Sequence, residues 1–554
     1  MRRTRPARTD PPLRIVPLGG LGEIGKNCTA LQYGEDVVLV DAGVMFPEEE
    51  LYGVDLVIPD FGFLRRANRR LLGVFLTHAH EDHVGSLSFL LREFRAPVYG
   101  TPLTLGLVRN KVRDGALHTV RPRQRVRLGP FEAEWVRVAH SVPDSCSVVV
   151  RTPAGTVVVS GDFKFDQTPI DGRPTDVARL AELGEEGVLA LLLDSTNVER
   201  PGMTPSERVV GERFQQLFAE APGRVLVTTF ASNVHRLQQA FDAAARSHRK
   251  VAAVGRSMVE VIRAASELGY LKFGKDAYVS VEEANRLPAR KVLLLVTGSQ
   301  GEPLSALTRI STGSHRQVRL KKGDTVVFSA TPIPGNEAMV ARTINHLFRQ
   351  GAEVVYGPAS GAHVSGHASQ EELRLMIHLL RPRYVVPVHG EYRHLVLNAR
   401  LAHSVGVPPD RVLVGENGTV FEFRDGQGKV AGKEDVGNVL VDGLGVGDVG
   451  AVVLRDRQHL ARDGVLVALV AVDRQTGRLV QGPDVISRGF VYEKGAEELM
   501  EAVREQVRQA VERCRKQGQT EFGAVRSEIR DQVSRFVYER TGRQPMVLPL
   551  LVEV

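Results

Sequence analysis

The chain has 554 residues, of which 43% are hydrophobic and 25% charged, a composition that fits a globular protein and excludes a disordered or fibrous one. This length is too great for one hydrophobic core, so about three or four domains are expected. The net charge of +7 and the pI of about 9.3 favour a polyanionic partner, although the arginines of the first twelve residues supply much of the excess.

The N-terminus, MRRTRPARTDPP, is basic and proline-rich and lacks the apolar stretch of a secretory signal, so residues 1–12 are predicted to be a flexible tail. No apolar run approaches the roughly 18 residues of a membrane helix. Cys28, Cys146 and Cys514 are odd in number and far apart, which indicates reduced thiols. We therefore expect a soluble, cytoplasmic protein.

Residues 13–200 are rich in strand patterns. LRIVPLGG and NCTALQYGEDVVLVDAG predict strands, and a tight Gly-Glu-Asp turn joins the two halves of the second segment. VGSLSFLLREF has helical spacing, and further strands are predicted at APVYG, VRLG, FEAEWVRVAH, CSVVVRT and GTVVVSGD. This region is interpreted as a sheet domain with few helices.

Two nucleotide-binding patterns overlap near the N-terminus. Gly20, Gly22 and Gly25 spell GxGxxG, with Asp41 about where a ribose-binding acid would lie, and the same stretch read as GxxxxGK ends in Asn27 instead of Ser or Thr. Both patterns require a helix to start at the glycines. The segment that follows fits a hairpin strand better, so the preferred interpretation is tight turns beside a site.

The stretch THAHEDHVG contains His78, His80, Asp82 and His83. In an extended segment alternate side chains point the same way, so His78 and His80 can share one cation. Asp82 and His83, where a helix begins, project elsewhere and can serve a second cation. A lone histidine is usually structural. Three histidines and an aspartate packed together would cost stability unless they coordinated an ion.

Further ligand-type residues directly follow apolar strands. His140 ends FEAEWVRVAH, Asp162 ends GTVVVSGD, and His389 lies in YVVPVHGE. Imidazole and carboxylate groups together suit zinc or manganese, and one carboxylate can bridge two ions. Cys146, in contrast, begins the apolar run CSVVV and is interpreted as a core residue.

Residues 201–361 alternate between strand and helix patterns, which predicts a separate α/β domain with a parallel, doubly wound sheet. Residues 362–430 then contain a helix, the strand YVVPVHGEY and short strands. A Gly-rich, charged linker is expected at 431–450. Residues 451–554 predict two strands around DRQTGR, two amphipathic helices and a last strand, an α+β domain without a catalytic constellation.

Taken together, these motifs resemble hydrolases of the metallo-β-lactamase fold, in their β-CASP nuclease branch, and most closely the bacterial ribonuclease J family. The resemblance covers nearly the whole chain. It rests on GGLGEIGKN, VDAG, THAHEDHVG, HSVPDS, SGDFKFD, DSTN, TTFASNVHR, GSQGEP, HVSGHAS and PVHGEY. It implies an αβ/βα sandwich, an inserted parallel α/β β-CASP domain and a small C-terminal α+β domain.

The resemblance also implies a division of roles. His78, His80 and His140 would hold one divalent metal ion. Asp82, His83 and His389 would hold the other, with Asp162 bridging. Asp41 would orient the ligand loop, although a turn-capping role is an open alternative. Asp194 and His367 would be catalytic, and either one could protonate the leaving oxygen.

For the substrate, the resemblance implies RNA, held with its 5′-monophosphate by Ser232, Asn233, His363 and Ser365. Ordinary capping and loop roles remain open for these residues. The implied activity is two-metal RNA hydrolysis to 5′-phosphorylated products in RNA maturation and decay, by a 5′-to-3′ exonuclease with some endonuclease activity. A homodimer or higher homo-oligomer and other RNA-decay proteins are the implied partners.

Two other functions stay open at this point. A small-molecule ester or lactam hydrolase of the same superfamily would share the metal site, but it would not need the large α/β insertion. A catalytically inactive RNA-binding scaffold would not need a complete ligand set.

Overall fold

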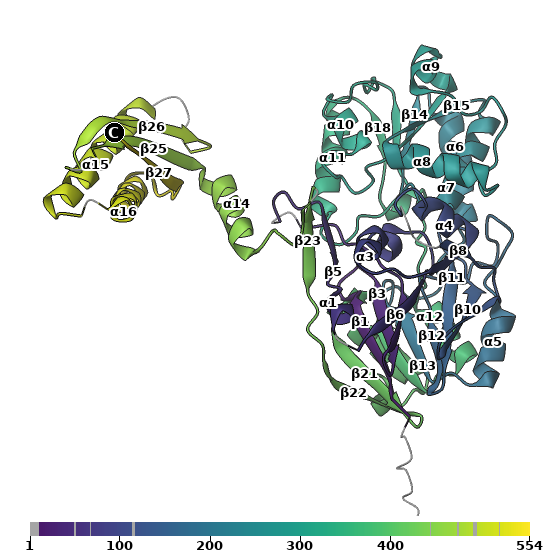
Figure 1. Cartoon of the computed structure of the whole chain (residues 1–554). Helices are drawn as coiled ribbons and strands as arrows, with labels where there is room; N and C mark the ends of the chain where they lie inside the picture. The colour runs from purple at the N-terminus through teal and green to yellow at the C-terminus, as the bar shows by residue number, and fades with distance from the viewer. Residues whose placement is uncertain are drawn as a thin grey trace, which may run out of the picture. The chain divides into compact units, whose positions relative to one another are not determined.

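A computed structural model describes residues 10–48, 51–66, 68–112, 117–443, 445–473, 476–490, 496–519 and 521–554 (Figure 1). Contacts within the chain divide it into two compact units. Unit 1 contains residues 1–46 and 56–439, and unit 2 contains residues 47–55 and 440–554.

An eight-stranded sheet forms the first layer of unit 1, in the order β22-β21-β1-β3-β4-β6-β7-β8. Its strands are β1 (Leu13–Gly19), β3 (Cys28–Tyr33), β4 (Asp36–Val40), β6 (Arg70–Phe75), β7 (Val98–Gly100), β8 (Leu117–Thr119), β21 (Thr419–Arg424) and β22 (Gln427–Lys433). The predicted hairpin is confirmed, because β3 and β4 pair antiparallel. From β4 onward the strands run parallel.

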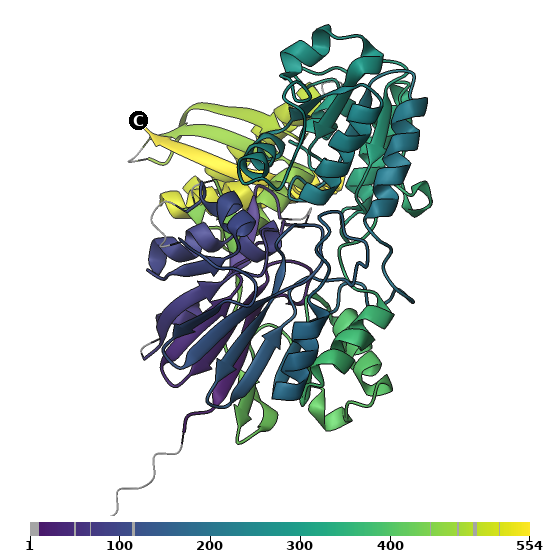
Figure 2. The same ribbon diagram turned by 90° about the vertical axis from the view of Figure 1, so that its right-hand side faces the viewer.

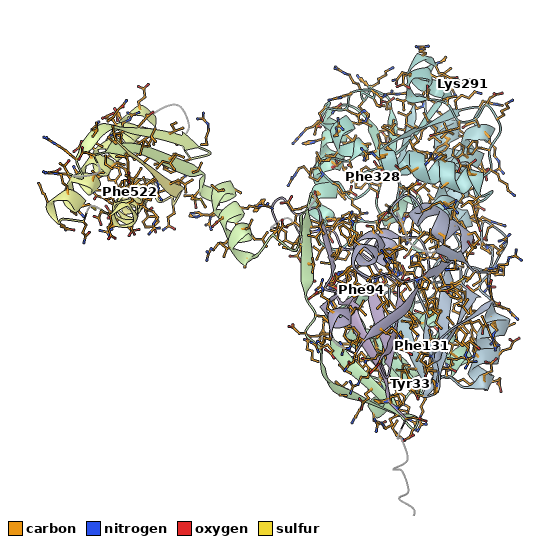
Figure 3. The ribbon with its side chains drawn as sticks, viewed as in Figure 1. Tyr33, Phe94, Phe131, Lys291, Phe328 and Phe522 are labelled. Atoms are coloured by element: carbon orange, nitrogen blue, oxygen red, sulfur yellow. The ribbon has the colours of Figure 1, made fainter. Side chains whose placement is uncertain are left out.

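A six-stranded sheet in the order β19-β13-β12-β11-β10-β9 forms the second layer. Its strands are β9 (Arg125–Leu128), β10 (Phe131–Arg137), β11 (Cys146–Thr152), β12 (Gly155–Val159), β13 (Ala190–Asp194) and β19 (Tyr384–Val388). Buried side chains of both sheets share one core, in which the rings of Phe75 and Trp135 meet edge to face at 5.5 Å. Phe131, labelled in Figure 3, is fully buried in this core.

Helices cover the outer face of the second sheet. These are α5 (Val177–Glu186), α12 (Gln370–Leu380) and α13 (Tyr392–Ser404), whose apolar residues share a core with the sheet (Figure 2). Shorter helices join the strands of the first sheet: α1 (Gly62–Arg65), α2 (Glu81–Val84), α3 (Leu87–Glu93) and α4 (Pro102–Val108). The predicted αβ/βα sandwich is confirmed.

The inserted region forms a fully parallel sheet in the order β15-β16-β14-β17-β18. The strands are β14 (Val225–Thr228), β15 (Lys250–Val254), β16 (Val292–Val296), β17 (Thr325–Phe328) and β18 (Glu353–Val355). The helices are α6 (Arg208–Glu220), α7 (Val234–Arg246), α8 (Arg256–Glu267), α9 (Val281–Arg286), α10 (Ala306–Ser311) and α11 (Glu337–Arg349). Separate cores on the two faces of the sheet confirm the doubly wound prediction.

The inserted domain is packed against the sandwich within unit 1. Ala79, Leu103 and Val142 of the sandwich belong to the same buried cluster as the apolar residues of α6 and α7. Ala79 and Val142 are close in sequence to predicted metal ligands. The junction of the two domains is therefore also the surroundings of the candidate site.

Unit 2 contains a three-stranded sheet with helices packed on one face. β23 (Asn438–Asp442) begins in unit 1 and ends in unit 2, where it pairs with β24 (Gly445–Val446). The other elements of unit 2 are α14 (Ala451–Asp463), β25 (Val465–Val472), β26 (Leu479–Arg488), α15 (Ala496–Lys516), α16 (Phe522–Thr541) and β27 (Met546–Glu553). The sheet order is β26-β25-β27, and buried residues of α15 and α16 fill its core. The predicted α+β unit is confirmed.

Several elements differ from the sequence-based expectations. The short strands expected after His389 are wrong for residues 392–404, which form α13 because Leu395, Ala399 and Ala402 have helical spacing and are buried. Within the range predicted as a linker, residues 431–433 form the end of β22, and the short strands β23 and β24 lie further along. Residues 1–9 of the predicted tail lie outside the described residues. No helix in the described ranges is long and apolar enough to cross a membrane.

Candidate metal centre

The predicted ligands lie in loops that follow strands. β6 leads into the stretch with His78, His80, Asp82 and His83, and α2 begins at Glu81. The other predicted ligands follow β10, β12 and β19, in the order His140, Asp162 and His389. All seven side chains converge, and their donor atoms form two groups of four that share Asp162.

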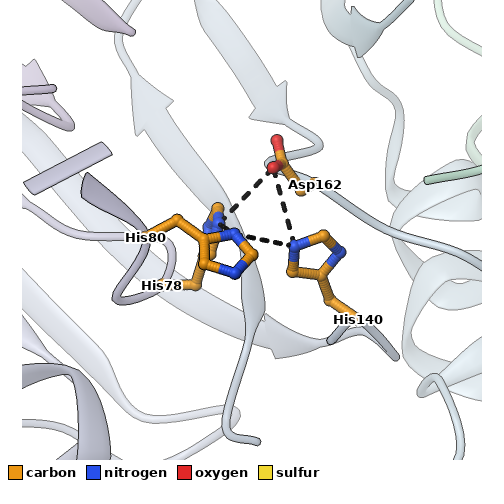
Figure 4. Close-up of side chains that lie close together, drawn as sticks. All are labelled: His78, His80, His140 and Asp162. Atoms are coloured by element: carbon orange, nitrogen blue, oxygen red, sulfur yellow. Dashed lines mark hydrogen bonds and ion pairs between the residues drawn. The ribbon is translucent and has the colours of Figure 1, made fainter. Parts of the chain in front are cut away.

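His78, His80 and His140 form one half of the cluster, which we call the three-histidine half (Figure 4). His80 Nδ1 lies 3.0 Å from His78 Nε2 and 3.1 Å from His140 Nε2. Asp162 Oδ2 lies 3.4 Å from His78 Nε2 and 3.7 Å from His140 Nε2. Three ring nitrogens and one carboxylate oxygen therefore face a common point.

Each ring of the three-histidine half has an uncharged partner for its other nitrogen. His140 Nδ1 is 2.8 Å from the carbonyl oxygen of Gly366, which can only accept, so this nitrogen carries the proton and Nε2 presents a lone pair. His78 Nδ1 is 3.0 Å from Thr77 Oγ1, and His80 Nε2 is 3.2 Å from Ser141 Oγ. These contacts orient all three rings.

The rings of this half are neutral at pH 7. Burial, followed by the charge of His78, lowers the pKa of His80 to about 3. Burial also lowers the pKa of His78 and holds that of His140 well below its ordinary value. Neutral imidazole is the form that coordinates a metal ion.

Asp82, His83 and His389 form the other half, which we call the mixed half. Asp82 Oδ2 lies 3.6 Å from both His83 Nε2 and His389 Nε2. Asp162 Oδ1 lies 3.2 Å from His83 Nε2 and 3.5 Å from His389 Nε2. The two oxygens of Asp162 thus face different halves.

Two further residues hold the mixed half in place. Asp41 accepts hydrogen bonds from the amide and hydroxyl of Thr77 at 2.8 and 2.7 Å, and its Oδ2 lies 2.7 Å from His83 Nδ1. Asn27, which the sequence analysis did not single out as a site residue, places its Nδ2 3.1 Å from His83 Nε2 and 3.2 Å from His389 Nδ1. The only signal for Asn27 in the sequence was its position after the glycine-rich turn.

Attraction between carboxylates and histidine rings distinguishes the mixed half from the three-histidine half. Burial would lower the pKa of His83, but the carboxylates of Asp162 and Asp82 outweigh burial and raise it well above its ordinary value. The pKa of His389 is raised for the same reason. Burial would raise the pKa of Asp162, but the rings of His83 and His389 hold it well below its ordinary value.

The donor set fits divalent cations. Asp162 Oδ1 is buried and accepts no hydrogen bond from any residue within the described ranges, although two ring nitrogens lie near it. Within each group of four, all donor atoms lie within 4.8 Å of one another. Buried imidazole and carboxylate groups that converge on a common point are typical of a site for zinc or a similar ion.

Asp194 and His367 lie beside this cluster. Asp194 Oδ2 is 2.8 Å from His367 Nδ1, and its Oδ1 accepts hydrogen bonds from the amide and hydroxyl of Thr196 at 2.9 and 2.8 Å. His367 Nε2 lies 3.8 Å from Asp162 Oδ2. Burial would lower the pKa of His367, but the carboxylates of Asp194 and Asp162 raise it to about 9.

The four residues expected to hold RNA lie on two loops. Ser232 and Asn233 precede α7, and Asn233 caps this helix by accepting from the amide of Arg236 at 3.0 Å, so the capping role left open by the sequence is present. His363 and Ser365 lie between β18 and α12. Arg236 links the loops, because its Nη1 is 3.2 Å from His363 Nδ1.

The glycine-rich stretch also lies at the site. β3 begins at Cys28, and the fully described stretch from Gly19 to Asp36 contains no helix, so the nucleotide-binding interpretation lacks the element that it requires. Gly20 and Gly25 have φ values of 91° and 118°, which favour glycine. The amide of His389 donates to the Gly20 carbonyl at 2.8 Å. The interpretation as tight turns beside a site is confirmed.

Comparison with protein families finds matches along most of the chain. Residues 21–256 match the metallo-beta-lactamase superfamily, and residues 222–347 match the beta-CASP domain of ribonuclease J. Residues 352–409 match the Zn-dependent metallo-hydrolase RNA specificity domain. Residues 452–554 match the ribonuclease J C-terminal domain.

Full-length relatives agree with these matches. The chain is 42% identical to ribonuclease J2 of Bacillus subtilis over 548 residues, which cover 98% of this chain and 99% of the relative. It is 44% identical to ribonuclease J of Thermus thermophilus over 556 residues, which cover 98% and 95%. A crystal structure of a protein of unknown function from Enterococcus faecalis has 16% identity and a TM-score of 0.54, and it covers 74% of this chain and 100% of that chain. That structure supports the fold alone.

Proposed function

Because the chain belongs to the ribonuclease J family and is a metal-dependent ribonuclease, we propose that it degrades single-stranded RNA from the 5′ end with a two-metal centre. It would act as a 5′-to-3′ exonuclease with some endonuclease activity and leave 5′-phosphorylated products. The observation that carries the two-metal proposal is the convergence of two donor groups on the two oxygens of Asp162.

The residues of the three-histidine half would hold one ion, those of the mixed half the other, and Asp162 would bridge them, with zinc or manganese as the metal. When bound, two such ions lower the pKa of a water and neutralise charge during in-line displacement at phosphorus. The fit of the donor set supports this assignment.

The chain itself contributes orientation. Thr77, Ser141 and Gly366 fix the rings of the three-histidine half, while Asp41 fixes His83. Because the side chains are bonded before substrate arrives, little reorganisation is needed at the moment of reaction.

We assign the proton donor to His367, with Asp194 as its positioning residue. Asp194 is only 2% exposed, and both of its oxygens already accept hydrogen bonds. His367 has its Nε2 on the side of Asp162, and the carboxylate of Asp194, which is not one of the predicted metal ligands, raises the pKa of this ring. A ring that holds its proton at neutral pH and faces the cluster is suited to protonate the leaving oxygen.

The loops with Ser232, Asn233, His363 and Ser365 would hold the RNA and its 5′-monophosphate. His363 and Ser365 lie within the match to the RNA specificity domain. Small hydroxyl and amide donors near glycines suit a phosphate pocket. The link between the two loops through Arg236 supports their acting together.

Family membership supports the remaining proposals. The domain division that we propose is 13–200 and 362–430 for the sandwich, 201–361 for the β-CASP domain and 451–554 for the C-terminal domain. We also propose that the protein is a cytoplasmic enzyme of RNA maturation and decay. It would form a homodimer or higher homo-oligomer and bind other RNA-decay proteins.

The test is hydrolysis of a 5′-labelled, 5′-monophosphorylated RNA with and without manganese or zinc. The proposal predicts release of labelled mononucleotide at the first time points without a ladder of intermediates, and no release after chelation of metal. Asp82→Ala should abolish the release, whereas the exposed His378→Ala, a histidine outside the cluster, should keep it. Internal cuts without any release of labelled mononucleotide would contradict the exonuclease assignment.

A further inference from the structure

We infer that Asn197 sets the preference for a phosphate at the RNA 5′ end by forcing Ser365 to act as a hydrogen-bond donor. The inference rests on the proposed role of Ser365 at the 5′-monophosphate. Asn197 is the last residue of the DSTN motif, and the sequence alone assigns it no role.

The orientation of the Asn197 amide is fixed by its surroundings. Asn197 is 6% exposed, and its Nδ2 donates to Ser365 Oγ at 2.8 Å and to the main-chain oxygen of His367 at 3.0 Å. A main-chain carbonyl can only accept a hydrogen bond. The nitrogen of the amide must therefore face this loop, and the contact with Ser365 is a bond that Ser365 accepts.

Ser365 accepts a second hydrogen bond from its own loop. The amide of His367 donates to Ser365 Oγ at 3.2 Å. A hydroxyl has two lone pairs and one proton, so two accepted bonds occupy its acceptor capacity and leave the proton to point elsewhere. Ser365 donates to no residue in the part of the chain that the structure describes, and its side chain is only half-buried. Its proton is therefore free to meet a ligand.

A serine held in this way discriminates between ligands. Phosphate oxygens are charged acceptors, and a hydrogen bond to a charged acceptor is about twice as strong as one between neutral groups. A 5′-hydroxyl can meet Ser365 only as a neutral acceptor, because the lone pairs of the serine are occupied. A freely rotating serine could instead accept from that hydroxyl. Asn197 thus removes the option that would favour 5′-hydroxyl RNA.

The test reverses this bond. Asn197→Asp places acceptor oxygens against Ser365, so the serine proton turns inward to the carboxylate and is lost to the ligand. The measurement is the ratio of kcat/KM for 5′-monophosphorylated RNA to that for 5′-hydroxyl RNA of the same sequence. We expect the ratio to fall roughly tenfold or more, the effect of losing one hydrogen bond to a charged group. Asn197→Ala should also lower it, since Ser365 then rotates freely.

A matched control separates specificity from general support of the loop. Thr204 Oγ1 donates to the same His367 oxygen at 2.7 Å without a hydrogen bond to Ser365. Thr204→Val should therefore lower turnover of both RNAs alike and leave the ratio unchanged. In the Ser365→Ala background, Asn197→Asp should no longer change the ratio, because the group through which it acts is gone.

The outcomes separate the inference from the proposed function. If the unmodified chain prefers the 5′-monophosphate and both Asn197 variants keep that preference, the inference is wrong and phosphate recognition stands. A fall in the ratio for Thr204→Val equal to that for Asn197→Asp would also overturn it. If the unmodified chain shows no preference, the proposed 5′-end recognition fails and the inference fails with it.

Discussion

The two halves of the candidate metal centre share Asp162 but are supported in different ways. The three-histidine half consists of neutral rings whose outer nitrogens meet a hydroxyl or a carbonyl. The mixed half contains the carboxylate of Asp82 and is supported by Asp41 and Asn27. Asp82 also keeps 31% of its side-chain surface exposed, while the ring of His78 is fully buried.

Because of this difference, we expect the two proposed ions to bind with unequal affinity. A buried set of neutral imidazoles suits zinc, whereas additional carboxylate oxygens suit harder ions such as manganese. The greater exposure of Asp82 also makes the mixed half easier to empty. We therefore expect the mixed half to exchange its ion first and to determine how activity depends on added manganese.

Removal of Asp162 should have the largest effect, because both halves of the candidate metal centre share this residue. Asp162→Asn leaves each half without the carboxylate that faces both, so we expect loss of both ions and a fall in turnover on the order of a thousandfold or more. Metal content per chain after dialysis is the measurement, with thermal unfolding to confirm that the variant folds. Retention of one tightly held ion would show that the halves do not depend on Asp162.

Removal of a ligand from one half should separate the two. We expect His140→Ala to lose the ion of the three-histidine half and His389→Ala to lose that of the mixed half, so that each variant retains about one ion. Turnover should fall on the order of a hundredfold or more in both. Elemental analysis of each purified variant gives the answer, and loss of both ions in either variant would contradict independent halves.

Asp41 should affect the mixed half more than the other. It contacts His83 directly but reaches His78 only through Thr77, so Asp41→Asn should weaken the mixed-half ion by roughly ten- to a hundredfold and the other ion less. Competition with a fluorescent chelator measures both affinities. Equal weakening of the two ions would mean that Asp41 supports the whole cluster through Thr77.

The smallest changes in ion affinity should come from removing one polar residue that contacts each half. Asn27→Ala should weaken the mixed-half ion and Ser141→Ala the three-histidine ion, each by about tenfold, the lower end for groups that orient ligands. Serial titration with a chelator, compared between the two variants, is sensitive enough for this purpose. If both variants weakened the same ion, the assignment of partners to halves would be wrong.

The residues of the candidate metal centre were predictable from the sequence because their signal is local. The close spacing of His78 and His80 is a property of one extended segment, and His140 and Asp162 each follow an apolar strand. The parallel sheet of the inserted domain was predictable for the same reason, because the hydrophobic periodicity and the turn residues of its strands and helices are also local signals.

The supporting residues were not predictable, because small polar residues are common in every loop. Asn27 and His389 are 362 positions apart, and only the folded chain brings them to 3.2 Å. Asn197 and Ser365 meet across 168 positions in the same way. Helix α13 is not predicted from the sequence, because the strand pattern of YVVPVHGEY continues beyond His389. In the structure the chain turns at His389, which has a φ of 54°, and α13 begins three residues later.

The most direct test of a two-ion ribonuclease is anomalous diffraction from crystals of the full chain equilibrated with zinc or manganese. We expect two peaks about 4 Å apart, one on each side of Asp162, with the histidines divided between them as described. A single peak, or peaks away from Asp162, would contradict it.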